Sequence, residues 1–599
     1  MSSISYESRK DVPEEYTWHL EDIFESDEAW FREYEELKKA PEETAAFAGK
    51  IGESAEKLLA WMRYDDELTK RLSMLYGYAS CRQDQDTADS FYQDMQGKAM
   101  SVYVAAAGAS AFALPEIMAV DDSTLQRFFE EEPELKLYER AFERLRHKKK
   151  HILSAAEEKL LAAAGEMASS PDSIIGAFRD ADLRYPDAAD AAGGKHALTA
   201  GTFTLLEESS DRTLRENAYR TVYGTLGKYK NIIAATLDAQ FRQLRFFADA
   251  RRYPDTLTAA LDENEIPVSV YTNLIGAVRA NLDKMYRYVA LRKKALGVKE
   301  LHMYDVYVSL AADAADEISF EEAKSTVLEG LAVLGEDYVE LLKKGFNERW
   351  IDVYENTGKR GGAYSTDASY PHPFVLLNHK NNLDSMFTLA HEMGHALHSW
   401  HSNTYQPFVY SDYPIFVAEV ASTCNEVLLM KYLLEKTTDK RKRAYLINYF
   451  LDQFKGTVYR QTMFAEFELM MGKLSESGET LTADTLCGKY LELNKLYFGP
   501  DMISDEEIAF EWARIPHFFY NYYVFQYATG FSAAVAIANR ILSEGEPAVR
   551  DYKKFLSGGC SKDPIALLKI AGVDMSSPEP VNSALCFFGE LTEEMEKLI

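Results

Sequence analysis

Two histidines and a glutamate within five consecutive residues could bind and use a metal ion. His391 and His395 stand four apart, and Glu392 directly follows the first histidine. Residues four apart on an α-helix lie one above the other on the same face, so both imidazoles can bind one Zn²⁺ ion. The carboxylate of Glu392 could then accept a proton from a water molecule held on the open position of the metal. The pattern H-E-x-x-H therefore predicts a metal-dependent hydrolytic site.

The surrounding sequence favours a helix at this place. Asn382 or Asp384 can cap its start, and apolar residues recur at spacings of three and four. Gly394 costs a helix about 1 kcal/mol relative to alanine. Such a glycine often marks a position where another backbone comes close. The apolar stripe consists of Met386, Ala390, Met393, Leu397 and Trp400.

Two candidates exist for a third metal ligand. His401 would be the ligand in an H-E-x-x-H-x-x-G-x-x-H site, but those sites need a helix-breaking glycine where this chain has His398. In a continuous helix His401 is rotated by about 240° from His395 and cannot reach the same ion. The other candidate is a carboxylate on a following helix, where Glu419 and Glu426 are seven apart and share one face. We expect Glu419 to be the ligand and Glu426 to accept a hydrogen bond from a liganding histidine.

Both motifs resemble those of the oligoendopeptidase F family, which is related to thimet oligopeptidase and neurolysin. The similar stretches are His-Glu-Met-Gly-His-Ala-Leu-His at 391–398 and Phe-Val-Ala-Glu-Val-Ala-Ser-Thr-Cys-Asn-Glu at 416–426. The resemblance implies that His391, His395 and Glu419 bind one zinc ion per chain and that Glu392 is the catalytic glutamate. It also implies a mainly α-helical fold with two lobes around a deep central channel, and a small β-sheet beside the zinc helix.

An aromatic stretch at 515–530 could supply hydrogen-bond donors to a reaction intermediate. Tyr520 and Tyr527 are seven apart, so a helix could direct both at one cleft. The resembled family uses a histidine and two tyrosines of this region to stabilise the oxyanion, and His517, Tyr520 and Tyr527 match them. The spacing from histidine to tyrosine is two residues shorter here than in the thimet-type pattern. The alternative is an aromatic helix packed in the core, which is our interpretation of Phe518, Phe519 and Phe525.

Two short segments before the histidine motif have the composition of β-strands. Residues 361–365 and 372–378 are brief, β-prone and bounded by glycine or polar residues. In the resembled family a strand edge pairs with the peptide substrate, which gives Gly362, Ala363 and Tyr364 a substrate-binding role. A purely structural turn and strand is the alternative. We interpret His372 as a hydrogen-bonded loop histidine.

Composition and charge narrow the possible partners. A net charge of −29 argues against nucleic acid or an anionic membrane surface. The uncharged run 99–115 predicts a buried helix, because a membrane span needs about 20 strongly apolar residues. The N-terminus lacks the apolar core of a signal peptide, and the five cysteines form no CxxC pair. We expect a cytoplasmic protein with reduced thiols.

The chain divides most naturally near residue 195. Residues 1 to about 200 have the pattern of a nearly continuous series of helices, with a capping box from Ser154 to Glu157. The segment Asp187 to Gly194 is rich in alanine, glycine and aspartate and indicates a loop. The prediction is an N-terminal helical domain at 1–195 and a catalytic domain at 196–599.

The motifs predict a zinc-dependent peptidase, and the resemblance implies an endopeptidase that hydrolyses internal bonds of short unstructured peptides. One alternative is a zinc-stabilised peptide-binding protein without catalysis. Another is a metallopeptidase that acts as a carboxypeptidase or on folded proteins. The sequence specifies neither the peptide preference nor the oligomeric state.

Overall fold

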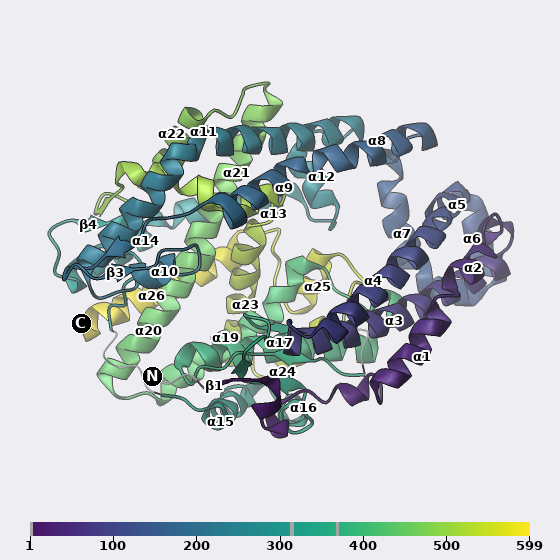
Figure 1. Ribbon diagram of the computed structural model, residues 1–599, viewed down its shortest axis with the longest axis horizontal. Helices are drawn as coiled ribbons and strands as arrows, with labels where there is room; N and C mark the ends of the chain where they lie inside the picture. The colour runs from purple at the N-terminus through teal and green to yellow at the C-terminus, as the bar shows by residue number, and fades with distance from the viewer. Residues whose placement is uncertain (1–3, 312–316, 367–370) are drawn as a thin grey trace. The chain divides into compact units, whose positions relative to one another are not determined.

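Helices dominate the fold of this chain. The structure is a computed structural model that describes residues 4–311, 317–366 and 371–599 (Figure 1). It is 73% helical, and every strand in the described residues is two residues long. The predicted mainly α-helical class is confirmed.

The chain forms two compact units, each assembled from three separate segments. Unit 1 comprises residues 1–150, 316–429 and 540–572, and unit 2 comprises 151–315, 430–539 and 573–599. The predicted domain boundary at residues 195 and 196 lies inside the first segment of unit 2. That division of the chain stays a prediction.

Unit 1 opens with a helical layer built around α3 and α4, which pack against each other. Its core contains the fully buried side chains of Trp30, Leu75 and Tyr78. Ser26 caps α1, where its hydroxyl accepts a hydrogen bond from the N–H of Ala29. The helices are α1 (Asp27–Leu37), α2 (Ala40–Ala45), α3 (Ala55–Gln85), α4 (Ser90–Ala109), α5 (Ala113–Ala119), α6 (Asp122–Glu131) and α7 (Glu139–His147).

The uncharged run at 99–115 is largely helical, but it is not buried. In α4 a single narrow stripe is covered, while Met100 and Val104 remain 44% and 60% exposed. The expectation of a buried helix is therefore wrong, because α4 packs through one stripe only. By length and composition, Ser90–Ala119 is the one stretch of the described residues apolar enough to cross a membrane, a test that helices of soluble proteins also pass. The covered stripe consists of Met95, Ala99, Val102 and Ala106.

A small sheet lies beside the helix that carries the histidine motif, as predicted. Its strand order is β5-β8-β7, with β8 (Val375–Leu376) parallel to β5 (Ile351–Asp352) and antiparallel to β7 (Tyr364–Ser365). Helix α17 (Leu383–Tyr405) contacts β7 and β8. The remaining helices of unit 1 are α15 (Phe320–Gly330), α16 (Glu336–Asn347), α18 (Phe408–Ser411), most of α19 (Ile415–Lys436), α24 (Glu546–Leu556) and α25 (Pro564–Ile570).

A buried ion pair fastens this sheet. The Lys359 ammonium lies 2.7 Å from the Asp352 carboxylate, and both side chains are inaccessible to solvent. Lys359 Nζ also donates to the carbonyl oxygens of Tyr354 at 2.7 Å and Leu377 at 2.6 Å. A buried ammonium is tolerated only when it is paired and hydrogen-bonded, which this one is. The contacts hold the turn after β5 against the residue that follows β8.

Unit 2 is organised around the long helix α11, which contacts α10, α21 and α22. The predicted capping box from Ser154 to Glu157 begins α8. Two strand pairs lie in this unit: β2 (Ala188–Ala189) with β3 (Lys195–His196), and β4 (Leu301–His302) with β9 (Met502–Ile503). The helices are α8 (Ala155–Ala168), α9 (Ser170–Gly176), α10 (Phe203–Glu207), α11 (Arg212–Ala250), α12 (Thr256–Asp262), α13 (Val268–Ala280), α14 (Leu282–Ala295), α20 (Lys440–Phe454), α21 (Gln461–Glu476), α22 (Ala483–Phe498), most of α23 (Phe525–Glu544) and α26 (Glu579–Leu598).

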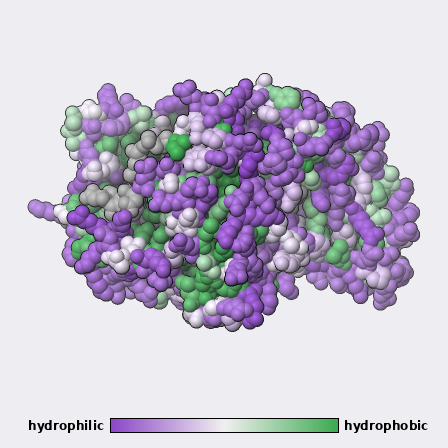
Figure 2. Space-filling view, turned by 90° about the horizontal axis from the view of Figure 1, so that it is seen from below, coloured by the Kyte–Doolittle hydropathy of each residue, from purple (hydrophilic) through white to green (hydrophobic). Residues whose placement is uncertain are grey.

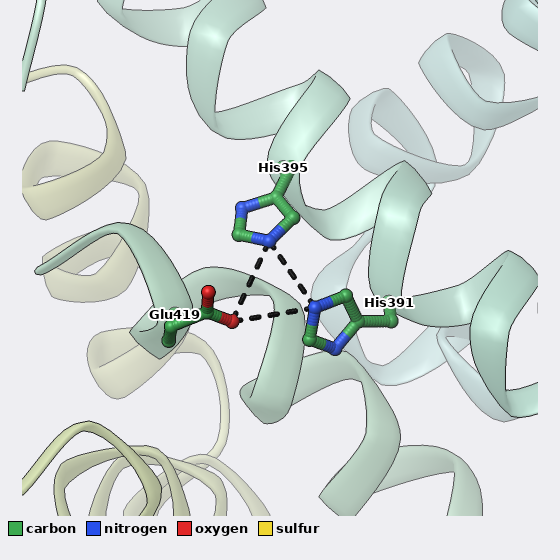
Figure 3. Close-up of side chains that lie close together, drawn as sticks. All are labelled: His391, His395 and Glu419. Atoms are coloured by element: carbon green, nitrogen blue, oxygen red, sulfur yellow. Dashed lines mark hydrogen bonds and ion pairs between the residues drawn. The ribbon is translucent and has the colours of Figure 1, made fainter. Parts of the chain in front are cut away.

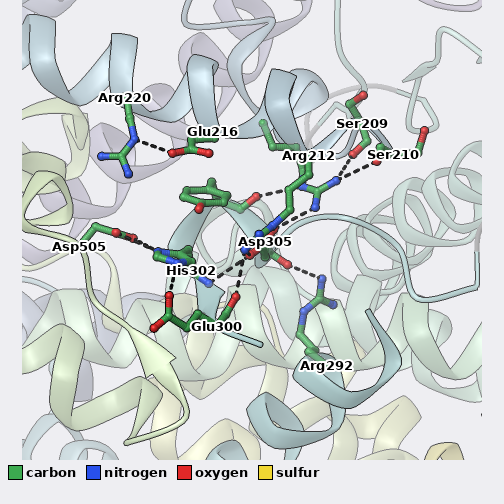
Figure 4. A network of polar contacts seen from close by, with 12 residues as sticks. Ser209, Ser210, Arg212, Glu216, Arg220, Arg292, Glu300, His302, Asp305 and Asp505 are labelled. Carbon is green, nitrogen blue, oxygen red and sulfur yellow. Dashed lines mark hydrogen bonds and ion pairs between the residues drawn. The ribbon is translucent and has the colours of Figure 1, made fainter. Parts of the chain in front are cut away.

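A network of charged side chains connects α11 to the β4–β9 pair (Figure 4). The buried carboxylate of Asp305 accepts hydrogen bonds from Arg212 Nη2 at 2.8 Å and Arg215 Nη2 at 2.9 Å. The ring of His302 contacts Asp505 with Nδ1 2.9 Å from Oδ1. Buried charged groups need such partners. The contact between His302 and Asp505 therefore holds the residues directly after β9, where the chain continues towards the aromatic stretch.

Hydrophilic residues cover most of the face shown in Figure 2, and hydrophobic residues form smaller areas between them. Acidic residues outnumber basic ones by 95 to 66 in the chain. The absence of nucleic-acid and membrane partners stays a prediction from this charge.

Candidate metal centre

Helix α17 begins and continues as its sequence predicts. The Asn382 side chain accepts a hydrogen bond from the N–H of Ser385 at 2.8 Å and so caps the helix. The apolar stripe is buried except for Trp400, which is partly exposed. The helix runs on to Tyr405 without a break. His401 is therefore rotated away from His395, as expected for a continuous helix.

Three side chains converge from α17 and α19 (Figure 3). The Nε2 atoms of His391 and His395 lie 3.2 Å apart. The Oε2 atom of Glu419 lies 3.3 Å from His391 Nε2 and 3.6 Å from His395 Nε2. Ligands placed tetrahedrally around Zn²⁺ at about 2.0–2.1 Å are separated by about 3.3 Å. The three atoms are thus spaced as ligands of one ion would be.

Direct backbone contact between α17 and α19 brings Glu419 to this position. A Cβ atom at Gly394 would lie 2.5 Å from Ser422 Cα and 2.9 Å from the carbonyl oxygen of Ala421. Real Cβ atoms essentially never come so close to backbone, so only glycine fits here. The close approach expected at Gly394 is confirmed. Gly394 lies between the two histidines, and Ser422 lies three residues after Glu419, so the close contact is within one turn of all three residues.

A buried amide adds a polar connection between the same helices. Asn425 Nδ2 donates to the carbonyl oxygen of Ala390 at 3.1 Å, directly before His391. Asn425 Oδ1 accepts from the Tyr338 hydroxyl at 3.0 Å. Ser422 Oγ, for its part, lies 3.3 Å from Glu419 Oε2. Our sequence reasoning missed these residues. Asn425 lies within the motif, but Tyr338 is 87 residues away in sequence, and no local spacing points to it.

Glu426 lies where the sequence places it. Its Oε1 atom contacts Nδ1 of His391. An ionised carboxylate can only accept, so Nδ1 of His391 carries the hydrogen, and Nε2 keeps its lone pair free for a metal. Burial raises the pKa of Glu419 and the two neighbouring imidazoles lower it, and the net result is a lowered pKa. It therefore stays an anion, as a ligand must.

Glu392 is buried beside these groups, with 7% of its surface exposed. Burial raises the pKa of Glu392 above its ordinary value. A carboxylate with a raised pKa is better suited to accept and then release a proton near neutral pH. The position and chemistry of Glu392 fit a general base.

The other histidines of this region have different surroundings. The ring of His398 stacks on Tyr413 with a centroid distance of 3.8 Å, and burial lowers its pKa. Burial also lowers the pKa of His401 to about 4. Among the described residues, the metal-sized group is His391, His395 and Glu419, without His401. His372 makes hydrogen bonds to Pro373 and Asp22, as we interpreted it from the sequence.

The residues predicted to bind substrate, Gly362, Ala363 and Tyr364, lie in or just before β7, an edge strand of the small sheet. The hydroxyl of Tyr364 donates to Asp84 Oδ2 at 2.7 Å, and Asn378 Nδ2 donates to the Gly362 carbonyl at 2.8 Å. Gly362 has a φ of +84°, which favours glycine. Within the part of the chain that is described, β7 pairs with β8 alone and forms an edge of the sheet. The predicted substrate-binding role of Gly362, Ala363 and Tyr364 stays a prediction.

The aromatic stretch forms a cluster in unit 2, but not on one helix. Tyr520 lies in a loop between η14 (Pro516–Phe519) and α23, so the expectation of a helix through Tyr520 and Tyr527 is wrong. The loop still brings the residues together. The Tyr527 hydroxyl lies 3.3 Å from His517 Nε2, and the rings of His517 and Tyr520 are 5.5 Å apart. The expected core residues are buried: Phe518, Phe519 and Phe525.

Comparisons with known proteins agree with this site. Residues 205–587 match the model of peptidase family M3, and residues 116–185 match that of oligopeptidase F. Oligopeptidase PepF of Bacillus subtilis is 47% identical over 591 residues, which cover 99% of this chain and 88% of that protein. Group B oligopeptidase PepB of Streptococcus agalactiae is 40% identical over 593 residues, covering 99% and 98%.

Solved structures share the fold along nearly the whole chain. The crystal structure of a putative peptidase from Chlamydophila abortus has a TM-score of 0.93 at 31% identity and covers 99% of this chain and all of that one (100%). Oligoendopeptidase-F from Enterococcus faecium has a TM-score of 0.74 at 35% identity, with 96% and 99% covered. The resemblance inferred from the motifs is confirmed. This chain belongs to peptidase family M3 and is a metallopeptidase.

Proposed function

We propose that this metallopeptidase is a zinc-dependent endopeptidase that hydrolyses internal bonds of short unstructured peptides. The observation that carries the proposal is the convergence of two imidazole nitrogens and one carboxylate oxygen, at separations of 3.2, 3.3 and 3.6 Å. Relatives at 47% and 40% identity are named oligopeptidases, which supports peptides as the substrate class.

The donor set fits one zinc ion per chain. Two neutral imidazoles and one carboxylate are a usual ligand set of catalytic zinc sites, which keep a position open for water or substrate. His391, His395 and Glu419 would hold the ion, and Glu426 would keep the His391 tautomer that leaves Nε2 available. When bound, zinc polarises a carbonyl group and lowers the pKa of water.

Glu392 is the proposed general base and acid. Its carboxylate accepts a proton from the attacking water and then gives it to the leaving amine. The raised pKa that burial gives Glu392 suits the second of these transfers, because a protonated carboxyl must persist until the amine leaves.

The cluster in unit 2 is the proposed source of oxyanion stabilisation. The hydroxyls of Tyr527 and Tyr520 donate hydrogen bonds to the developing negative charge, together with the His517 ring. Burial, aided by the charge of Arg179, lowers the pKa of His517, so its ring is neutral at physiological pH. The mutual contacts of these three residues support a shared role.

The further parts of the proposal concern substrate and setting. The open edge of β7 would pair with the backbone of an extended peptide through Gly362, Ala363 and Tyr364. An N-terminal domain at 1–195 and a cytoplasmic location complete the proposal. The acidic charge supports the absence of nucleic acid and membrane partners.

Chelation tests the metal chemistry. The purified protein is assayed on an internally quenched fluorescent peptide before and after dialysis against a chelator, and its metal content is measured. We expect one zinc ion per chain, loss of activity with the metal, and recovery when Zn²⁺ is added back. Bound zinc without any hydrolysis would favour the peptide-binding alternative. Activity that survives complete metal removal would contradict the proposal.

Blocked peptides separate the peptidase alternatives. Peptides acetylated at the N-terminus and amidated at the C-terminus are digested, and the products are mapped by mass spectrometry. An endopeptidase cuts both free and blocked forms internally, whereas a carboxypeptidase needs the free carboxylate. A folded protein and its unfolded, reduced form serve as matched substrates. Cleavage of the folded form would contradict the restriction to unstructured peptides.

A further inference from the structure

The loop that carries Tyr520 contains two consecutive residues in the left-handed region. Asn521 has a φ of +55° and Tyr522 a φ of +61°. Residues other than glycine adopt this conformation at a cost, and a tyrosine does so rarely. Such a conformation persists only where the surrounding structure imposes it, and it is found disproportionately at functional sites. The contacts of Asn521 and Tyr522 therefore show which residues impose this conformation on the loop.

Two buried polar side chains contact the loop around this pair, one at the Tyr522 backbone and the other at the Asn521 side chain and the Phe519 backbone. Glu468 Oε1, on α21, accepts the N–H of Tyr522 at 2.6 Å. Gln240 Nε2, on α11, donates to Asn521 Oδ1 at 2.8 Å and to the carbonyl oxygen of Phe519 at 3.2 Å. Both Glu468 and Gln240 are almost fully buried, at 0% and 3% exposure. The loop is thus attached to two long helices on either side of the left-handed turn.

The side chain of Tyr522 is confined as tightly as its backbone. It is 2% exposed, and its hydroxyl lies 2.7 Å from Thr256 Oγ1. A Cβ atom at Gly472 would lie 1.9 Å from that hydroxyl, so the absence of a side chain there makes room for it. The rings of Phe241 and Tyr271 meet the Tyr522 ring edge to face. The ring serves as an anchor that is not free to turn.

The left-handed turn is what allows His517 and Tyr527 to meet. In an uninterrupted helix, residues ten apart are separated by about 15 Å along the axis. In this chain the Tyr527 hydroxyl lies 3.3 Å from His517 Nε2. The chain therefore leaves a helical path between them, and the left-handed residues Asn521 and Tyr522 lie in that interval.

We propose that Glu468 and Gln240 are positioning residues, which hold the left-handed turn and thereby set the geometry of His517, Tyr520 and Tyr527. The inference rests on the proposed function of those three residues. Glu468 and Gln240 touch no reacting atom in this scheme: Glu468 acts through the backbone N–H of Tyr522, and Gln240 acts through the Asn521 side chain and the Phe519 carbonyl. Glu468 Oε2 has no hydrogen-bond partner within residues 4–311, 317–366 and 371–599. Burial also raises the pKa of Glu468 to about 8, so at neutral pH its carboxyl is mostly protonated and an amide can replace it.

Two substitutions of Glu468 separate positioning from bulk packing. Glu468→Gln keeps an oxygen that accepts the Tyr522 N–H, and we expect turnover close to that of the wild type. Glu468→Leu removes the acceptor, frees the turn and should lower kcat on the order of 10- to 100-fold, as small misplacements of catalytic groups do. Bound metal and KM should stay unchanged, because the metal ligands are untouched. Loss of kcat in the leucine variant with rescue in the glutamine variant is the expected result.

A matched control lies on the same helix. Glu466 is also buried, and its carboxylate contacts Arg279 and Tyr497 rather than the loop. Glu466→Leu should lower stability without a specific loss of kcat. If it lowers kcat as much as Glu468→Leu does, the positioning role is overturned. Should Glu468→Leu fail to fold, Gln240→Leu tests the same turn through Asn521, and an unchanged kcat there would overturn the proposal equally.

Combination with Tyr527→Phe shows whether Glu468 acts through the cluster. If it does, Glu468→Leu should lower kcat less in the Tyr527→Phe background than in the wild type, because only the contributions of His517 and Tyr520 remain to be lost. Full additivity of the two losses would contradict the proposal. Wild type and Glu392→Gln are measured alongside. An inactive wild type would count against the proposed function, whereas an active wild type with a fully active Glu468→Leu variant would count against this inference alone.

Discussion

The metal centre and the aromatic cluster are built in opposite ways. The ligands of the centre stand on two regular helices, whose backbones touch where Gly394 meets Ser422. The cluster joins a short 3-10 turn to the start of α23 through two left-handed residues. Regular spacing of residues in the sequence predicts where side chains lie only as long as the backbone stays helical. The left-handed turn also fixes the positions of side chains. The residues that contact this turn, however, lie far from it in the sequence.

The supports of the two sites differ in the same way. His391 is held by Glu426, 35 residues further along the chain, and both belong to helices recognisable from their sequence. The turn of the cluster is held by Gln240, which is 281 residues from Asn521, and by Glu468, 54 residues from Tyr522. Four substitutions can test this contrast, taken here in order of their expected effect on activity.

Glu392→Gln should have the largest effect, because it removes the proton acceptor and leaves the ligands in place. General acid–base catalysis contributes about 10²- to 10⁴-fold, so kcat should fall by that factor. Metal content, measured on the same preparation, should match the wild type. A variant that retains most of its turnover would remove Glu392 from the role of base.

Tyr527→Phe should follow, since it deletes one proposed oxyanion donor from the cluster. The loss of such a donor costs about 10²- to 10³-fold in kcat. Its matched control is Tyr523→Phe, whose ring lies 5.4 Å from that of Tyr527. An equal loss in both variants would mean that ring packing, rather than the Tyr527 hydroxyl, matters for turnover.

Gly394→Ala tests the contact between the two helices of the metal centre. The added Cβ would lie 2.5 Å from Ser422 Cα and force α17 and α19 apart, which moves Glu419 from the histidines. We expect about 1–3 kcal/mol lower stability and metal affinity weakened by about 10- to 100-fold. Gly97→Ala in α4 is the control, because nothing lies within 4 Å of its Cβ position. That change should stabilise the protein by about 0.5–1 kcal/mol. Equal metal affinities in the two variants would refute the argument.

Glu468→Gln should have the smallest effect on activity and a clear effect on the pH dependence of stability. The pKa of Glu468 is raised to about 8 in the folded protein from an ordinary value of 4.5. Folding therefore takes up a proton between these values, and the free energy of unfolding falls as pH rises from about 4.5 to 8. The glutamine variant should lack this part of the decline. Parallel pH profiles from denaturant titrations of both proteins would show that Glu468 does not titrate in this way.

Much of the metal centre could be predicted because its residues occur in two short sequence motifs, each within one helix. The four-residue spacing of His391 and His395 and the seven-residue spacing of Glu419 and Glu426 have meaning on any helix. The exposure of α4 could not be predicted from its uncharged composition. How much of a helix is covered depends on the neighbours that it finds, and α4 packs through one stripe only. Likewise the sequence of the aromatic stretch fits a helix, and the left-handed turn overrides it.

From the sequence alone one could predict a metal site, propose Glu392 as its base and locate the two helices that carry His391, His395 and Glu419. These follow from the helical repeat, which is a property of the backbone. The close approach of α17 to α19, the left-handed turn beside Tyr520 and the distant side chains that contact this turn became visible in the folded chain. Those features depend on packing between segments far apart in the chain, and no local spacing encodes such contacts.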